Sequence, residues 1–102
     1  MLMNIGNASL EENMERFEQR GWGVRELAKG LFLDYMRCSP GCQPGQEGVR
    51  LARIFRDCGL GWGDQPKATE SHQQYWGVAI MRTLEAEGLA ERVGESGPWR
   101  LR

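Results

Sequence analysis

The sequence predicts a mostly helical α+β fold, and three observations support this class. Apolar residues recur at helical spacing through most of residues 10–87. Two segments rich in glycine and proline, "CSPGCQPGQEG" and "GLGWGDQPKAT", interrupt the helical pattern as loops. Residues 89–102 change to a period of two around a "GESG" turn. With 102 residues the chain has the size of one domain, which we divide into an N-terminal helical arm at 1–22 and a domain at 23–102.

A capping box predicts where the first helix begins. Ser9 is followed three residues later by Glu12, so the helix should start near Leu10, and Gly21 is expected to end it. Its apolar stripe is narrow and consists of Leu10, Met14 and Phe17. Such a stripe fits an arm packed on the domain or on a second copy in a homodimer, and a solvated helix is equally consistent.

Two further helices are predicted in the middle of the chain. The first contains the most strongly apolar stripe, made of Val24, Leu27, Ala28, Leu31, Tyr35 and Met36, with Phe32 and Leu33 beside it. Apolar residues around so much of its girth predict a central, buried helix. The next helix should run from Gln46 to Cys58, with Gly59 after its end. A short strand at Glu47–Arg50 would pair with the terminal hairpin, although four residues are too few to predict one.

The last helix and the hairpin follow from the C-terminal sequence. Ser71 and Gln74 have capping-box spacing, with Thr69 as a competing cap, and the helix should end near Glu87 because Gly88 follows. "LAERV" and "PWRLR" then read as two strands joined by "GESG". Trp99 and Leu101 should face the helices, because a hairpin this short is not stable alone. Trp76 is also expected in the core.

The order helix, loop, helix, loop, helix and hairpin resembles the winged helix-turn-helix superfamily. The segment "MRTLEAEGLAERVG" followed by "PWRLR" is similar to that superfamily's passage from recognition helix to β-wing. The resemblance covers roughly residues 23–102 and implies a winged-helix domain with an extra N-terminal helix and a C-terminal wing. The loop before the last helix is longer than the three or four residues of a tight helix-turn-helix turn.

This resemblance implies binding of double-stranded DNA, with a role in transcriptional regulation. The recognition helix would enter the major groove with its first turns, where hydrogen-bonding side chains read base edges. Arginines on the wing would reach phosphates or a minor groove. The candidate contacts are Ser71, His72, Gln73, Gln74, Tyr75 and Arg82 on the helix, Lys67 before it, and Arg92, Arg100 and Arg102 on the wing. Capping, solvation or ion pairing is the competing role of each.

Charge argues mildly against a dedicated nucleic-acid binder. The formal net charge is −1; the four Glu and two Arg of residues 9–20 contribute −2, which leaves +1 for the remainder. Few phosphates would then be neutralised, so DNA affinity would be modest unless a dimer doubled the contacts. Arg50, Arg53 and Arg56 form a further row that would contact the DNA backbone or pair with acidic neighbours.

Other function classes receive less support. Three cysteines give no disulfide framework, and neither a secretory signal nor an apolar run of membrane-spanning length is evident, so a cytoplasmic protein is expected. Cys38, Cys42, Cys58 and His72 could form a Cys₃His zinc site, but their spacing is not diagnostic, and we expect ordinary thiols and no cofactor. No nucleophile or phosphate-binding motif indicates an enzyme.

The tryptophans support the main alternative, a winged-helix module that binds protein and not DNA. The sequence contains four Trp, and Trp22 and Trp62 each lie in a "GWG" context. Aromatic residues are enriched in protein interfaces. Packing of each Trp into a small core is the competing interpretation.

Overall fold

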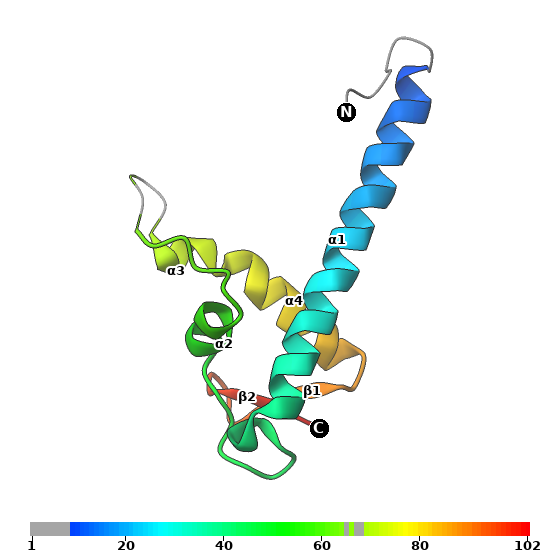
Figure 1. The fold of residues 1–102 in the computed structure, drawn as a ribbon. Coiled ribbons are helices and arrows are strands. Elements are labelled where there is room, and N and C mark those ends of the chain that lie inside the picture. The colour runs from blue at the N-terminus through cyan, green and yellow to red at the C-terminus, as the bar shows by residue number, and fades with distance from the viewer. Residues whose placement is uncertain (1–8, 65, 67–68) are drawn as a thin grey trace.

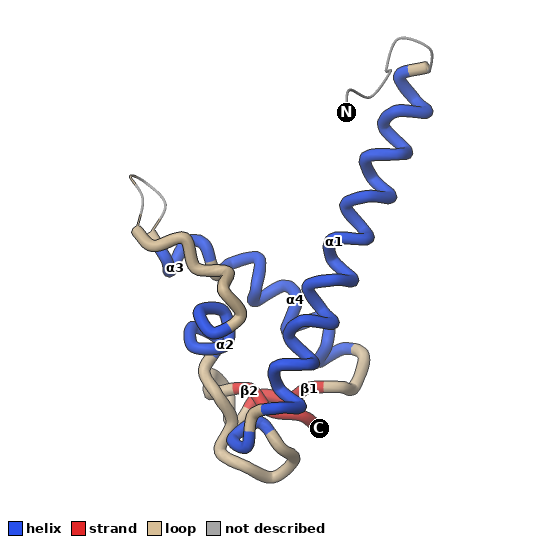
Figure 2. Tube along the Cα trace, viewed as in Figure 1, coloured by secondary structure: helices blue, strands red, loops and turns tan. Residues whose placement is uncertain are grey.

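The computed structural model describes residues 9–64, 66 and 69–102. The described chain is mostly helical and ends in a two-stranded antiparallel hairpin, which confirms the α+β class (Figures 1 and 2). In chain order the elements are α1 (Leu10–Cys38), the 3₁₀ helix η2 (Pro40–Cys42), α2 (Leu51–Asp57), α3 (Glu70–Gln73), α4 (Tyr75–Ala86), β1 (Ala90–Arg92) and β2 (Trp99–Leu101).

The first two predicted helices are one helix of 29 residues, α1. It begins as expected, because the Ser9 hydroxyl accepts a hydrogen bond from the Glu12 N–H at 3.1 Å. The expected end at Gly21 is wrong, and the proposed boundary at residue 22 lies within continuous helix. A helix-interior glycine costs about 1 kcal/mol relative to alanine, which is less than the cost of ending and renucleating a helix.

The N-terminal half of α1 extends away from the rest of the molecule (Figure 1). The radius of gyration is 16.8 Å, against about 13 Å for a compact domain of 100 residues. The expectation that Val24 and Leu27 face the core is wrong, because these side chains are 65% and 77% exposed. Helical spacing identified an apolar face of α1, but this half of that face has no element of the described chain against it.

The core lies where the C-terminal half of α1 meets α2, α4 and the hairpin. Phe32 and Met36 are fully buried there, together with Ile54 of α2 and Leu84 of α4. Trp76 contacts this core through Phe32 and Phe55, with ring centroids 6.3 and 5.4 Å away. It is nevertheless 43% exposed, so its expected burial is only partly confirmed.

The hairpin is confirmed, and a third segment pairs with it. β1 and β2 are antiparallel, with Glu91 opposite Arg100, and Trp99 is buried as expected. Val49 adds an isolated bridge to Trp99 through two backbone hydrogen bonds of 2.8 and 2.9 Å. The extended backbone at Val49 and the φ of +82° at Gly48 delay α2 to Leu51, so the expected start of this helix at Gln46 is wrong.

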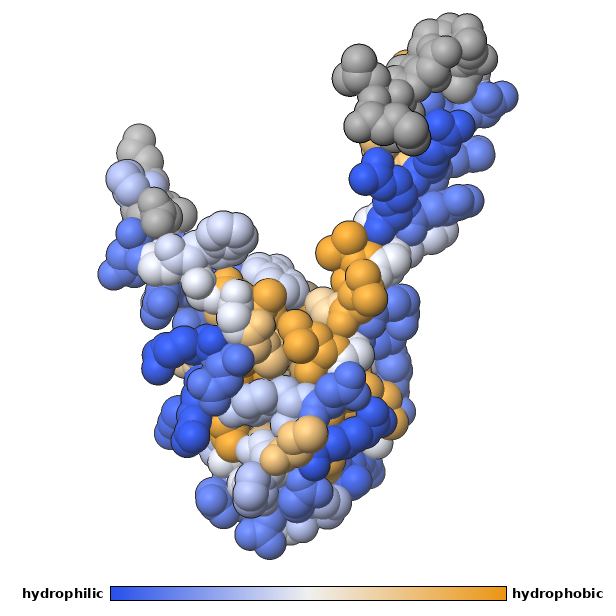
Figure 3. Space-filling view, in the orientation of Figure 1, coloured by the Kyte–Doolittle hydropathy of each residue, from blue (hydrophilic) through white to orange (hydrophobic). Residues whose placement is uncertain are grey.

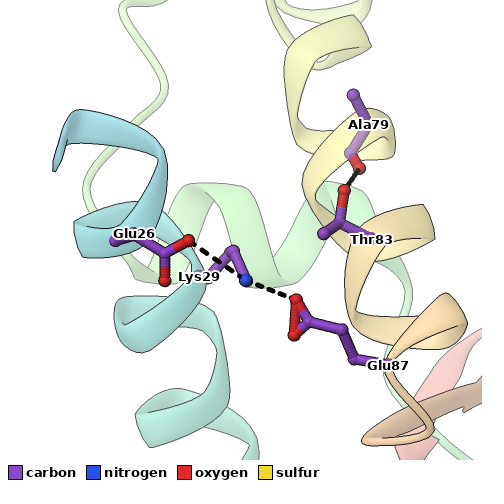
Figure 4. Close-up of polar contacts among 5 residues, drawn as sticks. All are labelled: Glu26, Lys29, Ala79, Thr83 and Glu87. Atoms are coloured by element: carbon purple, nitrogen blue, oxygen red, sulfur yellow. Dashed lines mark hydrogen bonds and ion pairs between the residues drawn. The ribbon is translucent and has the colours of Figure 1, made fainter. Parts of the chain in front are cut away.

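An ion pair links α1 to α4. The Lys29 Nζ contacts carboxylates of Glu26 on its own helix and of Glu87 just beyond α4 (Figure 4). These bonds raise the pKa of Lys29, and the bond to Glu87 has the largest effect.

A second polar contact joins α2 to α1, where the Tyr35 hydroxyl donates to Asp57 Oδ2 at 2.7 Å. Burial, followed by this bond, raises the pKa of Tyr35 to about 12. This bond and the Lys29–Glu87 ion pair both join the packed half of α1 to the rest of the domain.

Candidate nucleic-acid interface

The long loop before α3 is fastened to that helix by side chains. The Gln73 amide accepts a hydrogen bond from the Trp62 N–H at 2.9 Å and donates to the Gly63 carbonyl at 2.7 Å. Asp64 Oδ1 accepts a hydrogen bond from the Glu70 N–H at 3.0 Å. Gln73 therefore holds the loop, and its amide is occupied within the chain. Nothing in the local sequence pattern indicates this contact, because the partners lie ten and eleven residues away.

The cap of the fourth predicted helix is not where the capping-box spacing placed it. Thr69, the competing cap, occupies the N-cap position of α3, and the expected cap at Ser71 is wrong. The Glu70 N–H donates to Asp64. The Thr69 hydroxyl lies 3.2 Å from His72 Nδ1. Gln74 separates α3 from α4 but keeps helical hydrogen bonds to Glu70 and from Val78. The two helices thus form one nearly continuous rod.

One face of this rod is directed outward. The side of α4 that includes Ile80 and Leu84 is buried in the core. Tyr75, Ala79 and Arg82 lie on the opposite side at helical spacing, and all three are exposed. At the leading end of the rod, Ser71 and His72 are also exposed. The outward face therefore carries hydrogen-bonding groups separated by a small alanine.

The hairpin places a second arginine, Arg92, at the same Trp99 ring that Arg82 contacts. The guanidinium carbon of Arg82 lies 6.0 Å from the centroid of the Trp99 ring, and that of Arg92 lies 5.0 Å from the same ring. Arg92 also donates to the Glu95 carbonyl at 3.0 Å, while its buried Nε has no hydrogen-bond partner among the described residues. Arg82 forms an ion pair with Glu85 at 2.9 Å. Exposed pairs of this spacing contribute about 0.2–0.5 kcal/mol, so a phosphate could displace it.

The remaining wing candidates lie elsewhere. Arg100 donates through Nε to Glu91 at 2.7 Å and through its terminal nitrogen to the Gln46 carbonyl at 2.8 Å, and its side chain is three-quarters buried. It ties the hairpin to the loop before α2. Arg102 is exposed at the chain end, and Lys67 lies outside the described residues.

The arginines of the third predicted helix have different surroundings. Arg53 pairs with Asp57 on its own helix at 3.4 Å. Within the described part of the chain, Arg50 and Arg56 are exposed and form no ion pair. Arg50 and Arg53 border a shallow hollow beside Ser39 and Glu47.

The cysteines and His72 are dispersed over the fold. Cys42 is fully buried in the core, its thiol 3.7 Å from the Trp99 carbonyl, and burial raises its pKa. Burial and then Asp57 raise the pKa of the Cys58 thiol, while Cys38 is exposed at the end of α1. No three His, Cys, Asp or Glu side chains of residues 9–64, 66 and 69–102 gather where they could hold a metal ion. The Cys₃His arrangement considered above is therefore not formed.

Comparisons with known proteins gave no match to a protein-family model, a characterised protein or a solved structure. Within the described residues, none of the helices combines the length and apolar character that crossing a bilayer requires.

Proposed function

We propose that this protein is a winged-helix DNA-binding protein and that the outward face of α3–α4, with the hairpin as wing, contacts double-stranded DNA. The element order supports the fold assignment. The C-terminal half of α1, the Val49 bridge, α2, the α3–α4 rod and the hairpin follow one another as helix, strand, helix, helix and wing. The DNA-binding activity is inferred from the side chains exposed on the α3–α4 rod and the hairpin.

The observation that carries the proposal is the meeting of Arg82 and Arg92 at Trp99. One guanidinium comes from the exposed face of α4 and the other from the hairpin, so a helix in a groove would bring both to the flanking phosphates. Tyr75 and Ala79 lie further toward the leading end of the same face. A small side chain allows close approach to base edges and can contact a thymine methyl group.

The contacts within the chain divide the predicted DNA-binding residues into those that are already occupied and those that are available to DNA. Gln73 and Arg100 are held by bonds within the chain, so in this proposal they support the loop and the wing and do not read DNA. Ser71, His72 and Tyr75 are the candidates for base contacts, and Arg82 and Arg92 are the candidates for phosphate contacts. Few cations take part, so affinity should be modest and should fall with added salt.

Fluorescence anisotropy with random-sequence duplex DNA, at two salt concentrations, tests the proposal. Arg82→Ala should weaken binding about threefold to tenfold for all sequences and should flatten the salt dependence by about one phosphate contact. Arg16→Ala is the matched control, because it removes the same charge from the exposed arm of α1. Circular dichroism checks that both variants keep their helices.

Two results would contradict the proposal. Absence of DNA binding by the unaltered protein at low salt would show that the protein is not a DNA-binding protein. Equal losses in Arg82→Ala and Arg16→Ala would show nonspecific attraction without the assigned docking face. The alternative, a protein-binding module, would then be favoured by Trp62, whose side chain in the fastened loop is 81% exposed.

A further inference from the structure

A second apolar periodicity runs along α1, from the exposed arm into the half that packs on the domain, where Ala28 and Tyr35 contact the core. Leu10, Met14, Phe17, Gly21, Val24, Ala28, Leu31 and Tyr35 follow one another at alternating steps of four and three residues. This is the heptad pattern of a coiled-coil seam, with Leu10, Phe17, Val24 and Leu31 at d and the other four residues at a. We refer to these eight residues as the seam. Every seam residue from Leu10 to Val24 is exposed, and Leu31 is partly so.

The part of the seam from Leu10 to Val24 forms an apolar surface on the arm. Phe17, Val24 and Leu27 line a shallow apolar groove together with Gly21. Figure 3 shows apolar side chains along the middle of α1, on the side that faces α3 in that view. Exposed apolar surface of this extent usually marks an interaction site.

We propose that a second copy of this chain covers the seam, with the two α1 helices antiparallel and residues whose numbers sum to 45 opposite one another. Met14 then faces Leu31 of the second copy, Phe17 faces Ala28, and Gly21 faces Val24. Each pairing occurs twice, because a two-fold interface is isologous. Tyr35 lies at the end of the seam, where its hydroxyl is already bonded to Asp57.

Side-chain size supports this register. Two of the three internal layers combine a small residue with a larger one, as close packing requires. A parallel arrangement would place identical residues opposite one another, so Gly21 would leave a void and two Phe17 rings would meet in one layer.

Charge complementarity supports the same register. Glu18 and Arg25 occupy e positions, and in an antiparallel pair e faces e, so each Glu18 meets Arg25 of the second copy. A register shifted by one heptad, with opposed residue numbers that sum to 38, would bring two Glu18 side chains together and also two Arg20 side chains. In a parallel pair Arg20 would face Arg25 of the second copy. Among these three arrangements, the proposed one alone pairs Glu18 with Arg25.

Light scattering after size exclusion, and sedimentation equilibrium, measure this association without DNA, so the result is independent of the proposed DNA binding. Over roughly 1–200 μM the unaltered protein should pass from monomer toward dimer by mass action. Val24→Asp should weaken dimerisation by more than about 100-fold, because it buries two unpaired carboxylates. Gln19→Asp is the matched control, since it places the same side chain on the opposite, exposed face of α1.

Charge exchange tests the orientation. Arg25→Glu should weaken the dimer roughly tenfold, because two attractive contacts become repulsive. The double variant Glu18→Arg with Arg25→Glu should restore the dissociation constant to within about threefold. A tighter dimer with Arg25→Glu would indicate the parallel arrangement and overturn the proposal. A monomer at every concentration, or equal losses in Gln19→Asp and Val24→Asp, would overturn it as well.

Discussion

The two halves of α1 have the same kind of sequence but different environments. Both halves carry an aromatic residue and several aliphatic residues at helical spacing. In residues 28–38 this face buries Phe32 and Met36 against α2, α4 and the hairpin. In residues 10–27 the apolar side chains, including Phe17 and Val24, are exposed. The comparison shows that periodicity identifies an apolar face, whereas burial depends on a partner that periodicity does not identify.

The largest expected difference between the halves comes from removing one phenylalanine from each. Phe32→Ala should lower the free energy of unfolding by about 3–5 kcal/mol, because it empties a fully buried site. Phe17→Ala should change it by less than about 0.5 kcal/mol at concentrations where the seam is unpaired. Urea unfolding followed by circular dichroism measures both. A comparable loss in the two variants would mean that the arm folds back onto the domain in solution.

Glycines of the packed domain and of the exposed arm should also respond in opposite directions, and Gly48, before α2, gives the larger response. It has a φ of +82°, and an added Cβ would lie 3.0 Å from the Trp99 carbonyl oxygen and 3.1 Å from Val93. Gly48→Ala should therefore destabilise the protein by about 1–3 kcal/mol. The measurement is again urea unfolding, with Gly45→Ala as control, since Gly45 shares the positive φ but has open space around it. Equal effects would mean that backbone strain, and not the contact with the hairpin, dominates.

The hairpin could be predicted from the sequence because its signals are local. Gly88 ends α4 with a φ of +76°, and the two strands follow within fourteen residues of that turn. The Val49 bridge was suggested by position but was too short to predict. The end expected at Gly21 failed for the opposite reason, because a local breaker was outweighed by the cooperative hydrogen bonding of a long helix.

The candidate site was less predictable, since side-chain partners there are distant in sequence. Arg100 alternates with the buried Trp99 as expected, yet its bond to the Gln46 carbonyl spans 54 positions. Gln73 was a candidate for base contacts, but it is occupied by the loop around Trp62. The convergence of Arg82 and Arg92 on one ring depends on how the hairpin folds over α4. Composition alone could identify the cations but could not show which of them lie together.

The smallest expected effect tests whether the exposed half of α1 has the proposed partner. Gly23→Ala should stabilise the monomer by about 0.5–1 kcal/mol, because a Cβ there meets nothing within 4 Å and alanine favours the helix. Gly21→Ala should give the same gain at low protein concentration, for the same reason. At concentrations where dimer forms, the two should diverge: position 23 lies outside the seam, whereas a methyl group at position 21 would crowd Val24 of the second copy. Unfolding curves for both variants at two protein concentrations measure this divergence. Equal gains at both concentrations would mean that nothing packs against Gly21, and the apolar face of the arm would then have a different partner from the one proposed.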